Sequence, residues 1–404
     1  MRILDISPRH VTPARRGSAV RVSNLLRHLS DSCEVRQICL MESMPLPTGP
    51  TREVQHSPSY REYQIRSKSV AVVSQIAERS WVRAPVLSGA ALRLFPPRCL
   101  DDWLRWADVV MVEFPWQFEF IRRRVSSTPL VLASHNVEIQ KFRSYAEAQG
   151  VNTTNSLWLR YIRKAEANAV RHANLILAVS ADDKAAFTDE YGVTPDKVLE
   201  IPNGADTALY HPVDAEAKRA LKVQLGLPPL PLVIYVGAKI PPNLVGLKWV
   251  SRVAERTDQF TFVVVGPLFS QAFRKRNFIA TGMTDDYLRW LQAADISICP
   301  IQYGGGTKIK LWEALAAGLP VVAFEESVLG TGMEPGEHLR VCGKSEDEIL
   351  SALHYLVTHP GEAATMALAG REYVLAHNDW KHAANRLAKV LVDLCQNGKS
   401  PARD

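Results

Sequence analysis

The sequence predicts an α/β fold in which two Rossmann-like, doubly wound domains face a central cleft. Short apolar runs alternate with longer helical patterns, and this alternation stops near residue 202 and restarts near residue 232. A chain of 404 residues is also longer than one ordinary hydrophobic core requires. Both observations favour two domains of comparable size.

Four apolar runs in the first half predict buried parallel strands. They are "RILDIS", "ADVVMVEF", "PLVLASHN" and "ANLILAVS", at residues 2–7, 107–114, 129–136 and 173–180. Strands buried on both faces are typically continuous in hydrophobicity rather than alternating. Helical patterns such as "SAVRVSNLLRHLS" lie between some of these runs, as a doubly wound sheet requires.

Residues 67–105 mix apolar, aromatic and basic side chains without strand periodicity. We expect helices there, beside the cleft. Their simplest role is to cover the sheet, and the alternative is a contact with the acceptor or with a membrane.

Prolines and charged residues between positions 202 and 231 indicate a domain boundary. The strand pattern then resumes with "LVIYVGA", "FTFVVVG", "ADISICP" and "LPVVAF", at residues 232–238, 260–266, 294–300 and 319–324. Ligands bind such sheets beyond the carboxyl ends of the strands, so the loops after these runs are expected to face the cleft.

The composition limits the classes of function. A formal net charge of +6 suits an anionic ligand or a membrane surface but is too small for a typical nucleic-acid-binding protein. The six cysteines have no CxxC spacing, so we expect neither a zinc site nor a disulfide framework, and a reducing cytoplasm fits best. We find no signal peptide and no apolar run long enough to span a bilayer.

The segment "GGGTKIKLWEALAAGLPVVA", residues 304–323, predicts an anion site. Its glycines let the backbone approach a ligand, and the helix that follows offers free amides at its positive end. Lys308 and Lys310 add cations, while Glu313 suits a neutral part of the ligand such as ribose hydroxyls. On the residues alone, a glycine turn before a solvated helix end remains the alternative. Likewise, His135 could be an ordinary polar residue at a strand end.

This segment closely resembles the donor-binding motif of GT-B glycosyltransferases of the retaining family 4, in its GGGT subgroup. Other segments match that family in the expected order: "IPNGADTALYHP", "YVGAKIPPNLVGLKWV", "MTDDYLRWLQAADISICPIQYGGGTK" and "TGMEPGEHLRV", with "PARRGSAVRVSNLLRHLS" and "SHNVE" earlier in the chain. The resemblance is dense from residue 203 to 341 and thinner before.

The resemblance implies roles for individual residues. Glu313 matches the ribose-binding glutamate, Gly17 a glycine that approaches the diphosphate from the other domain, and His135 a histidine near the donor sugar and acceptor. The implied donor-binding residues are Gly17, Lys239, Asn243, Gly305, Gly306, Thr307, Lys308, Lys310 and Glu313, and the implied catalytic residues are His135, Lys308 and Lys310.

The resemblance also implies the domain layout. It places an acceptor-binding domain at residues 1–205 and a nucleotide-sugar-binding domain at residues 206–385. The helix predicted from "NDWKHAANRLAKVLVDLC" would cross back, so that residues 386–404 pack toward the first domain.

We therefore expect a retaining, metal-independent glycosyltransferase without a cofactor. Its donor would be a nucleoside-diphosphate sugar, with UDP-sugar preferred over GDP-sugar, and its acceptor a hydroxyl of a glycan, a lipid-linked glycan or a natural product. Lysines and helix amides suit a departing diphosphate, and no DxD motif occupies a convincing position after a strand. We expect a cytoplasmic protein, with peripheral contact at the inner face of the membrane allowed. The alternatives are a nucleotide-sugar epimerase of the same fold and a catalytically silent nucleotide-sugar-binding subunit.

Overall fold

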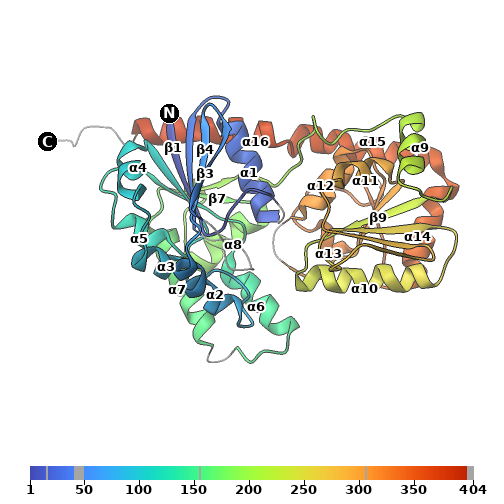
Figure 1. Cartoon of the computed structure of the whole chain (residues 1–404), viewed down its shortest axis with the longest axis horizontal. Coiled ribbons are helices and arrows are strands. Elements are labelled where there is room, and N and C mark those ends of the chain that lie inside the picture. Colours follow the sequence, from blue (N-terminus) through green and yellow to red (C-terminus); the bar gives the residue numbers. More distant parts are fainter. Residues whose placement is uncertain (15–16, 41–49, 154–155, 305–306, 398–404) are drawn as a thin grey trace. The chain divides into compact units, whose positions relative to one another are not determined.

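The computed structural model describes residues 1–14, 17–40, 50–153, 156–304 and 307–397, and it divides into two units (Figure 1). Met1–Pro202 and Lys381–Asp404 belong to the first unit, and Asn203–Trp380 form the second. Each unit contains a mostly parallel sheet with flanking helices. The predicted α/β class with two doubly wound domains is confirmed.

In the described residues, the first unit contains an eight-stranded sheet in the order β3-β4-β2-β1-β5-β6-β7-β8. Only β3 is antiparallel to its neighbour. The strands are β1 (Arg2–Ser7), β2 (Glu34–Cys39), β3 (Arg52–Ser57), β4 (Tyr60–Gln64), β5 (Val109–Glu113), β6 (Leu130–Ala133), β7 (Leu175–Ala178) and β8 (Val198–Glu200).

The predicted strands of this unit are found as β1, β5, β6 and β7, each fully buried apart from the first residue of β1. The helices are α1 (Gly17–Leu29), α2 (Lys68–Glu78), α3 (Ser88–Leu94), α4 (Leu100–Trp106), α5 (Phe118–Arg122), α6 (Glu138–Ala148), α7 (Leu157–His172), α8 (Ala181–Tyr191) and α16 (Trp380–Asn397), with a 3-10 turn at Pro195–Lys197. The helices expected within residues 67–105 are α2, α3 and α4.

The second unit contains a seven-stranded sheet in its described residues, in the order β11-β12-β10-β9-β13-β14-β15. Its strands are β9 (Leu232–Val236), β10 (Thr261–Val265), β11 (Phe273–Lys275), β12 (Phe278–Gly282), β13 (Ile296–Cys299), β14 (Val321–Ala323) and β15 (Arg340–Val341). Only β11 is antiparallel to its neighbour, and β9, β10, β13 and β14 occupy the four predicted runs.

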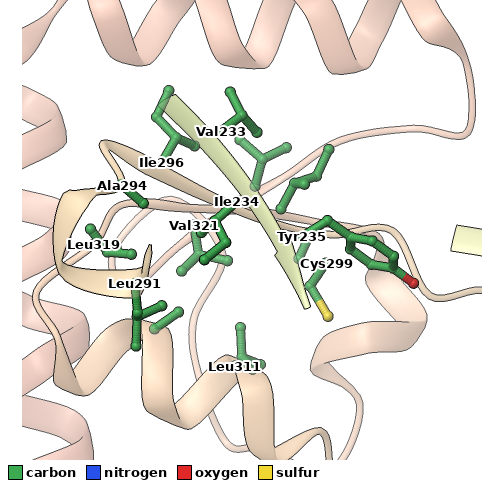
Figure 2. Packing of buried hydrophobic residues seen from close by; sticks show 14 of the residues in the cluster. Val233, Ile234, Tyr235, Leu291, Ala294, Ile296, Cys299, Leu311, Leu319 and Val321 are labelled. Atoms are coloured by element: carbon green, nitrogen blue, oxygen red, sulfur yellow. The ribbon is translucent and has the colours of Figure 1, made fainter. Parts of the chain in front are cut away.

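Helices cover both faces of this second sheet (Figure 1). They are α9 (Ala215–Gln224), α10 (Pro241–Glu255), α11 (Tyr287–Ala293), α12 (Ile309–Ala316), α13 (Glu325–Val328), α14 (Glu346–Thr358) and α15 (Pro360–His377). Figure 2 shows the core around β9, where Ile234 and Tyr235 lie among residues of neighbouring elements such as Leu291 and Leu311. This packing fixes the carboxyl ends of the strands, where the candidate site begins.

The two ends of the second unit are joined to each other. The amide of Ala205 donates to the carbonyl of Asn378 at 2.8 Å, and the Asn378 side chain donates to the carbonyl of Asn203 at 2.7 Å. A Cβ at Gly204 would lie 2.0 Å from the Asn378 carbonyl oxygen, so only glycine permits this approach. The chain then returns to the first unit through α16.

Candidate functional site

Glu313 lies on α12 with 6% of its surface exposed. Tyr287 of α11 donates to Glu313 Oε2 at 2.7 Å, and Tyr210 also donates to this carboxylate. Burial raises the pKa of Glu313 to about 7, although the two tyrosines and the nearby Lys310 act in the opposite direction. Glu313 is therefore a buried carboxylate whose orientation is fixed by two tyrosine hydroxyls, and its protonation state changes near neutral pH.

Lys310 is one turn before Glu313 and is held by the end of β9. Its ammonium donates at 2.7 Å both to the carbonyl of Val236 and to Oδ1 of Asn243, and it lies 4.8 Å from the ring centroid of Tyr235. Burial lowers the pKa of Lys310 to about 8. Because an ammonium has three N–H groups, these two bonds leave one for a ligand.

Asn243 fixes the loop between β9 and α10. Its side-chain Nδ2 donates to the carbonyl of Ala238 at 2.9 Å, and its backbone carbonyl accepts from the Tyr235 hydroxyl at 2.8 Å. Lys239, in the same loop, is exposed, and its side chain makes no hydrogen bond or ion pair with the described residues. The structure thus gives Asn243 a local structural contact, while Lys239 points its charge into solvent.

Thr307 and Lys308 precede α12. Thr307 is buried, and its carbonyl and hydroxyl oxygens accept from the Asn203 side chain at 3.3 and 3.1 Å. Lys308 occupies the N-cap position of α12, and its ammonium donates to the carbonyl of Gly304 at 3.1 Å. Gly305 and Gly306 lie outside the described residues.

The carboxyl ends of β9 and β10 approach each other through two glycines. Gly266 has a φ of +113°, and a Cβ there would lie 2.4 Å from the carbonyl oxygen of Gly237. A side chain at position 266 is therefore excluded both by conformation and by space. The carboxyl ends of β9 and β10 are therefore in close backbone contact next to the loop that carries Lys239.

His135 follows β6 in the first unit and is 8% exposed. Its Nε2 lies 2.5 Å from Oε2 of Glu113, the last residue of β5, and the Phe114 ring stacks on the imidazole with centroids 4.2 Å apart. Phe114 has a φ of +68°, an unusual conformation for a non-glycine residue. The ring of His135 is thus fixed by a carboxylate at its edge and an aromatic face beside it.

Burial sets the charges around His135. Burial lowers the pKa of His135 to about 3, with a further decrease from the buried Arg21, so the imidazole is neutral. Burial raises the pKa of Glu113 to about 7, and Arg21 opposes that rise. Arg21 lies one turn after the exposed Gly17, the first residue of α1, and donates to the carbonyl of Ile201 at 2.7 Å.

The predicted residues thus form two groups, one in each unit. In the second unit, Lys310 is hydrogen-bonded to Asn243 and interacts electrostatically with Glu313, whereas His135 and Gly17 belong to the first unit. The residues that hold these side chains are not predicted from the sequence: Asn203, Tyr210, Tyr287, Glu113 and Arg21. For Glu113 a signal exists, because a lone carboxylate ends the apolar run "VVMVE".

Two features of the described residues bear on cofactors and membranes. Within the described ranges, His, Cys, Asp and Glu side chains form no group of three or more that could hold a metal ion. Of the helices in the described part of the chain, none combines the length and hydropathy that crossing a bilayer needs.

Comparison with family models matches most of the chain to two domains. Residues 15–209 match the model "Glycosyltransferase Family 4", and residues 247–389 match "Glycosyl transferase-like".

Curated relatives match at modest identity. The D-inositol 3-phosphate glycosyltransferase of Rhodococcus jostii is 26% identical over 67% of this chain and 62% of that protein. The GDP-mannose-dependent alpha-(1-6)-phosphatidylinositol monomannoside mannosyltransferase of Mycobacterium tuberculosis is 28% identical over 54% of this chain and 61% of its own. In both cases the chain spans less than two thirds of the relative's length.

Among solved structures, the sucrose-phosphate synthase from Thermosynechococcus elongatus superposes with a TM-score of 0.74. The match covers 98% of this chain and 100% of that one, at 17% sequence identity. At this identity, the likeness establishes the fold.

Proposed function

The chain belongs to the GT-B glycosyltransferases, in the group with family 4 domains, and we propose that it is itself a retaining glycosyltransferase. Its donor is a nucleoside-diphosphate sugar, and its acceptor is a hydroxyl of a glycan, a lipid-linked glycan or a small molecule. The arrangement of Glu313 on α12 is the observation that carries this proposal.

Glu313 suits a ribose. A carboxylate that is buried and held by two tyrosine hydroxyls keeps a fixed orientation and can accept two hydroxyl hydrogen bonds side by side. The cationic Lys310 lies one turn away, toward the amino end of α12. A ligand whose neutral diol meets Glu313 and whose anionic part meets the helix start fits this polarity.

In the transfer step, the bond from the anomeric carbon to the diphosphate breaks and the bond to the acceptor oxygen forms on the same face. The acceptor proton passes to the leaving phosphate oxygen. Lys308 and the first amides of α12 stabilise the negative charge that develops on that phosphate. No metal is needed in this scheme, so we propose that activity survives chelation of divalent cations.

We propose a UDP-sugar as the first donor to test, and GDP-mannose as the alternative, because the mycobacterial relative is named as GDP-mannose-dependent. Asn243 and Lys239 are proposed near the diphosphate, on the loop after β9.

A peripheral contact between the first unit and an anionic membrane is also proposed. Lys68, Val72 and Ile76 follow one another at four-residue spacing, so they share one face of α2, and Arg79 directly follows the end of this helix. All four residues are exposed. Val72 and Ile76 are 53% and 57% exposed. Two apolar side chains between two cations are suited to the interface of an anionic bilayer.

Sedimentation with phosphatidylglycerol-containing vesicles tests this contact. Val72→Ser with Ile76→Ser should reduce binding, whereas Leu368→Ser, at a 58% exposed position of α15 in the second unit, should not. Equal binding by all three proteins would refute the assignment of the surface.

The function is tested by ligand binding and turnover on the full chain. We expect one nucleotide among UDP, GDP, ADP and dTDP to raise the melting temperature selectively, with the same shift in EDTA. The matching donor sugar should then be transferred with retention, as read from the anomeric proton coupling of the product. An epimerised donor in the absence of acceptor would indicate the epimerase alternative, and binding without turnover toward any acceptor tested would indicate the silent subunit.

A further inference from the structure

A row of buried polar side chains crosses the sheet of the first unit. The Tyr60 hydroxyl donates to Oε1 of Gln37 at 2.7 Å, and Nε2 of Gln37 donates to Oδ2 of Asp5 at 2.8 Å. Asp5 is hydrogen-bonded to Glu113, which lies 2.5 Å from Nε2 of His135. The five residues come from β4, β2, β1, β5 and the end of β6, which are consecutive in the sheet.

Strand register explains why this row is continuous. Asp5 and Gln37 are direct partners across β1 and β2, so their side chains lie on the same face. Glu113 is two residues beyond Met111, the partner of Asp5 on β5, and therefore shares that face too. Asp5, Gln37 and Glu113 are all at most 3% exposed.

The hydrogen bonds fix the direction of the row. Because the amide oxygen of Gln37 accepts from Tyr60, its nitrogen faces Asp5. Oδ1 of Asp5 is buried and receives no N–H or O–H from the described residues. Two ionised carboxylates side by side would leave this oxygen unsatisfied and repel each other. A proton on Asp5, donated to Glu113, removes both costs.

We propose that Asp5 is a positioning residue that, in its protonated form, holds Glu113 as an anion and thereby fixes His135 in the tautomer with its proton on Nε2. Nδ1 then remains as an acceptor for a hydroxyl of the donor sugar or of the acceptor. In the described residues, no hydrogen-bond partner contacts Nδ1. Only this last step, the contact with substrate, rests on the proposed glycosyl transfer.

The surrounding charges agree with this assignment. Burial raises the pKa of Asp5 well above its ordinary value, and the neighbouring Glu113 raises it further. The hydrogen bond from Asp5 and the charge of Arg21 both favour the ionised form of Glu113. The charged groups that face the row are Arg21 of α1, Glu62 of β4, Glu138 and Lys141 of α6, and Asp183 of α8 through Arg21.

The tautomer of His135 can be measured directly. The full chain is labelled with ¹⁵N in its histidine rings, and the ring nitrogens are recorded at neutral pH, with His135→Gln identifying the signals. We expect a neutral ring with a protonated Nε2 and an unprotonated Nδ1, and this form should be most complete at about pH 8, above the pKa of about 7 of Glu113. An imidazolium, or a proton on Nδ1, would overturn the proposal.

Two substitutions of Asp5 separate the proton from the charge. Asp5→Asn keeps both a donor toward Glu113 and an acceptor for Gln37, so the wild-type tautomer should persist. Asp5→Ala removes the donor, so Glu113 should take up a proton and donate it to Nε2, which moves the imidazole proton to Nδ1. If the His135 proton is no longer on Nε2 in Asp5→Asn, the proposal is wrong. This test holds even if Asp5→Ala does not fold.

Asp108→Asn is the matched control. Asp108 precedes β5 at the opposite end from Glu113 and pairs with Arg2. Its substitution removes a carboxylate from the same strand region without touching the row, so the His135 signals should not move. A tautomer change in this control would mean that the signals report general loosening of the unit.

Kinetics provide the second readout. Asp5→Ala should lower kcat by roughly 10²-fold with little change in KM for the donor, while Asp5→Asn stays near wild type. Equal kcat in Asp5→Ala would refute the positioning role even if the tautomer shifts. If the wild-type protein transfers no sugar at all, the proposed function fails, and the nitrogen spectra alone still decide the state of the row.

Discussion

At the scale of single residues, Glu313 yields a prediction about pH. Burial raises its pKa to about 7, and the ionised form is the better acceptor for ribose hydroxyls. Nucleotide affinity should therefore rise as pH increases through about 7 and fall below it. Titration calorimetry at several pH values checks this, and Glu313→Gln should remove the pH dependence. If nucleotide affinity depends on pH in the same way in Glu313→Gln, another titratable group is responsible for the pH dependence.

Removing the Glu313 side chain should weaken nucleotide binding by about 1–3 kcal/mol, because a charged hydrogen bond is lost. Tyr287→Phe removes one donor to the same carboxylate, at 2.7 Å, and should weaken binding by a smaller amount, about 1 kcal/mol. Unchanged nucleotide affinity in Glu313→Ala would exclude its ribose role.

We expect the alanine substitutions of Lys308 and Lys310 to have different effects, although both lysines belong to the same sequence motif. Lys310→Ala leaves the carbonyl of Val236 and Oδ1 of Asn243 without their donor, so it should reduce the unfolding free energy by about 1–3 kcal/mol. Lys308→Ala should lower turnover with a smaller change in melting temperature. Thermal unfolding and steady-state kinetics of both variants check this. If both variants lose the same unfolding free energy, the proposed difference between a structural Lys310 and a catalytic Lys308 is wrong.

The site residues that the sequence indicates are those whose type is tied to a local pattern. The glycine run, the two lysines and Glu313 fall within 10 consecutive positions, 304–313, so spacing alone groups them. Tyr210, Tyr287 and Glu113 act across elements distant in sequence, so no local pattern could place them next to Glu313 or His135.

At the scale of elements, β4 anchors the loop that leads from β1 toward α1. Glu62 accepts from the amides of Val11 and Thr12 at 3.1 and 3.4 Å, from Gln64 at 3.1 Å, and lies 3.0 Å from Nε2 of His56. Burial alone would raise its pKa, but these hydrogen bonds lower it to about 2. The loop is thus held by an ionised carboxylate.

Because the folded-state pKa of Glu62 is depressed, its contribution to stability is complete above the ordinary pKa of 4.5 and is lost as pH falls toward about 2. Glu62→Gln should therefore be less stable at neutral pH by roughly 3 kcal/mol and lose less stability on acidification. Chemical unfolding at neutral and acidic pH checks this. If Glu62→Gln loses as much unfolding free energy on acidification as the wild type, another group causes the acid sensitivity.

Some strands can be predicted from the sequence and others cannot, and the difference depends on how deeply each strand is buried. Those buried on both faces, such as β5 and β10, are continuous apolar runs and are recognised directly. The edge elements β3 and β11 are mostly exposed and polar, with sequences "REVQHS" and "FRK", so tertiary pairing rather than composition makes them strands. β4 is not predicted, because its sequence, "YREYQ", alternates buried side chains, two of them polar, with half-buried ones and contains no apolar run.

At the scale of the whole molecule, α16 contributes to the first unit although it follows the second in sequence. Near its end, Cys395 Sγ lies 3.5 Å from the carbonyl oxygen of Asp108. Leu391 is fully buried, so Leu391→Ala should cost about 2–5 kcal/mol, whereas Val392→Ala, at a 37% exposed position, should cost little. Denaturant unfolding compares them, and equal effects would contradict docking of this face.

The joined ends of the second unit have a consequence for protein synthesis. Residues 203–380 form one continuous segment whose two ends are hydrogen-bonded to each other through Asn203, Ala205, Asn378 and Trp380, whereas the first unit is completed only by α16. As the nascent chain leaves the ribosome, the second unit can therefore close while the first still lacks its final helix. Until that helix is released, the apolar surface that it covers remains exposed to chaperones.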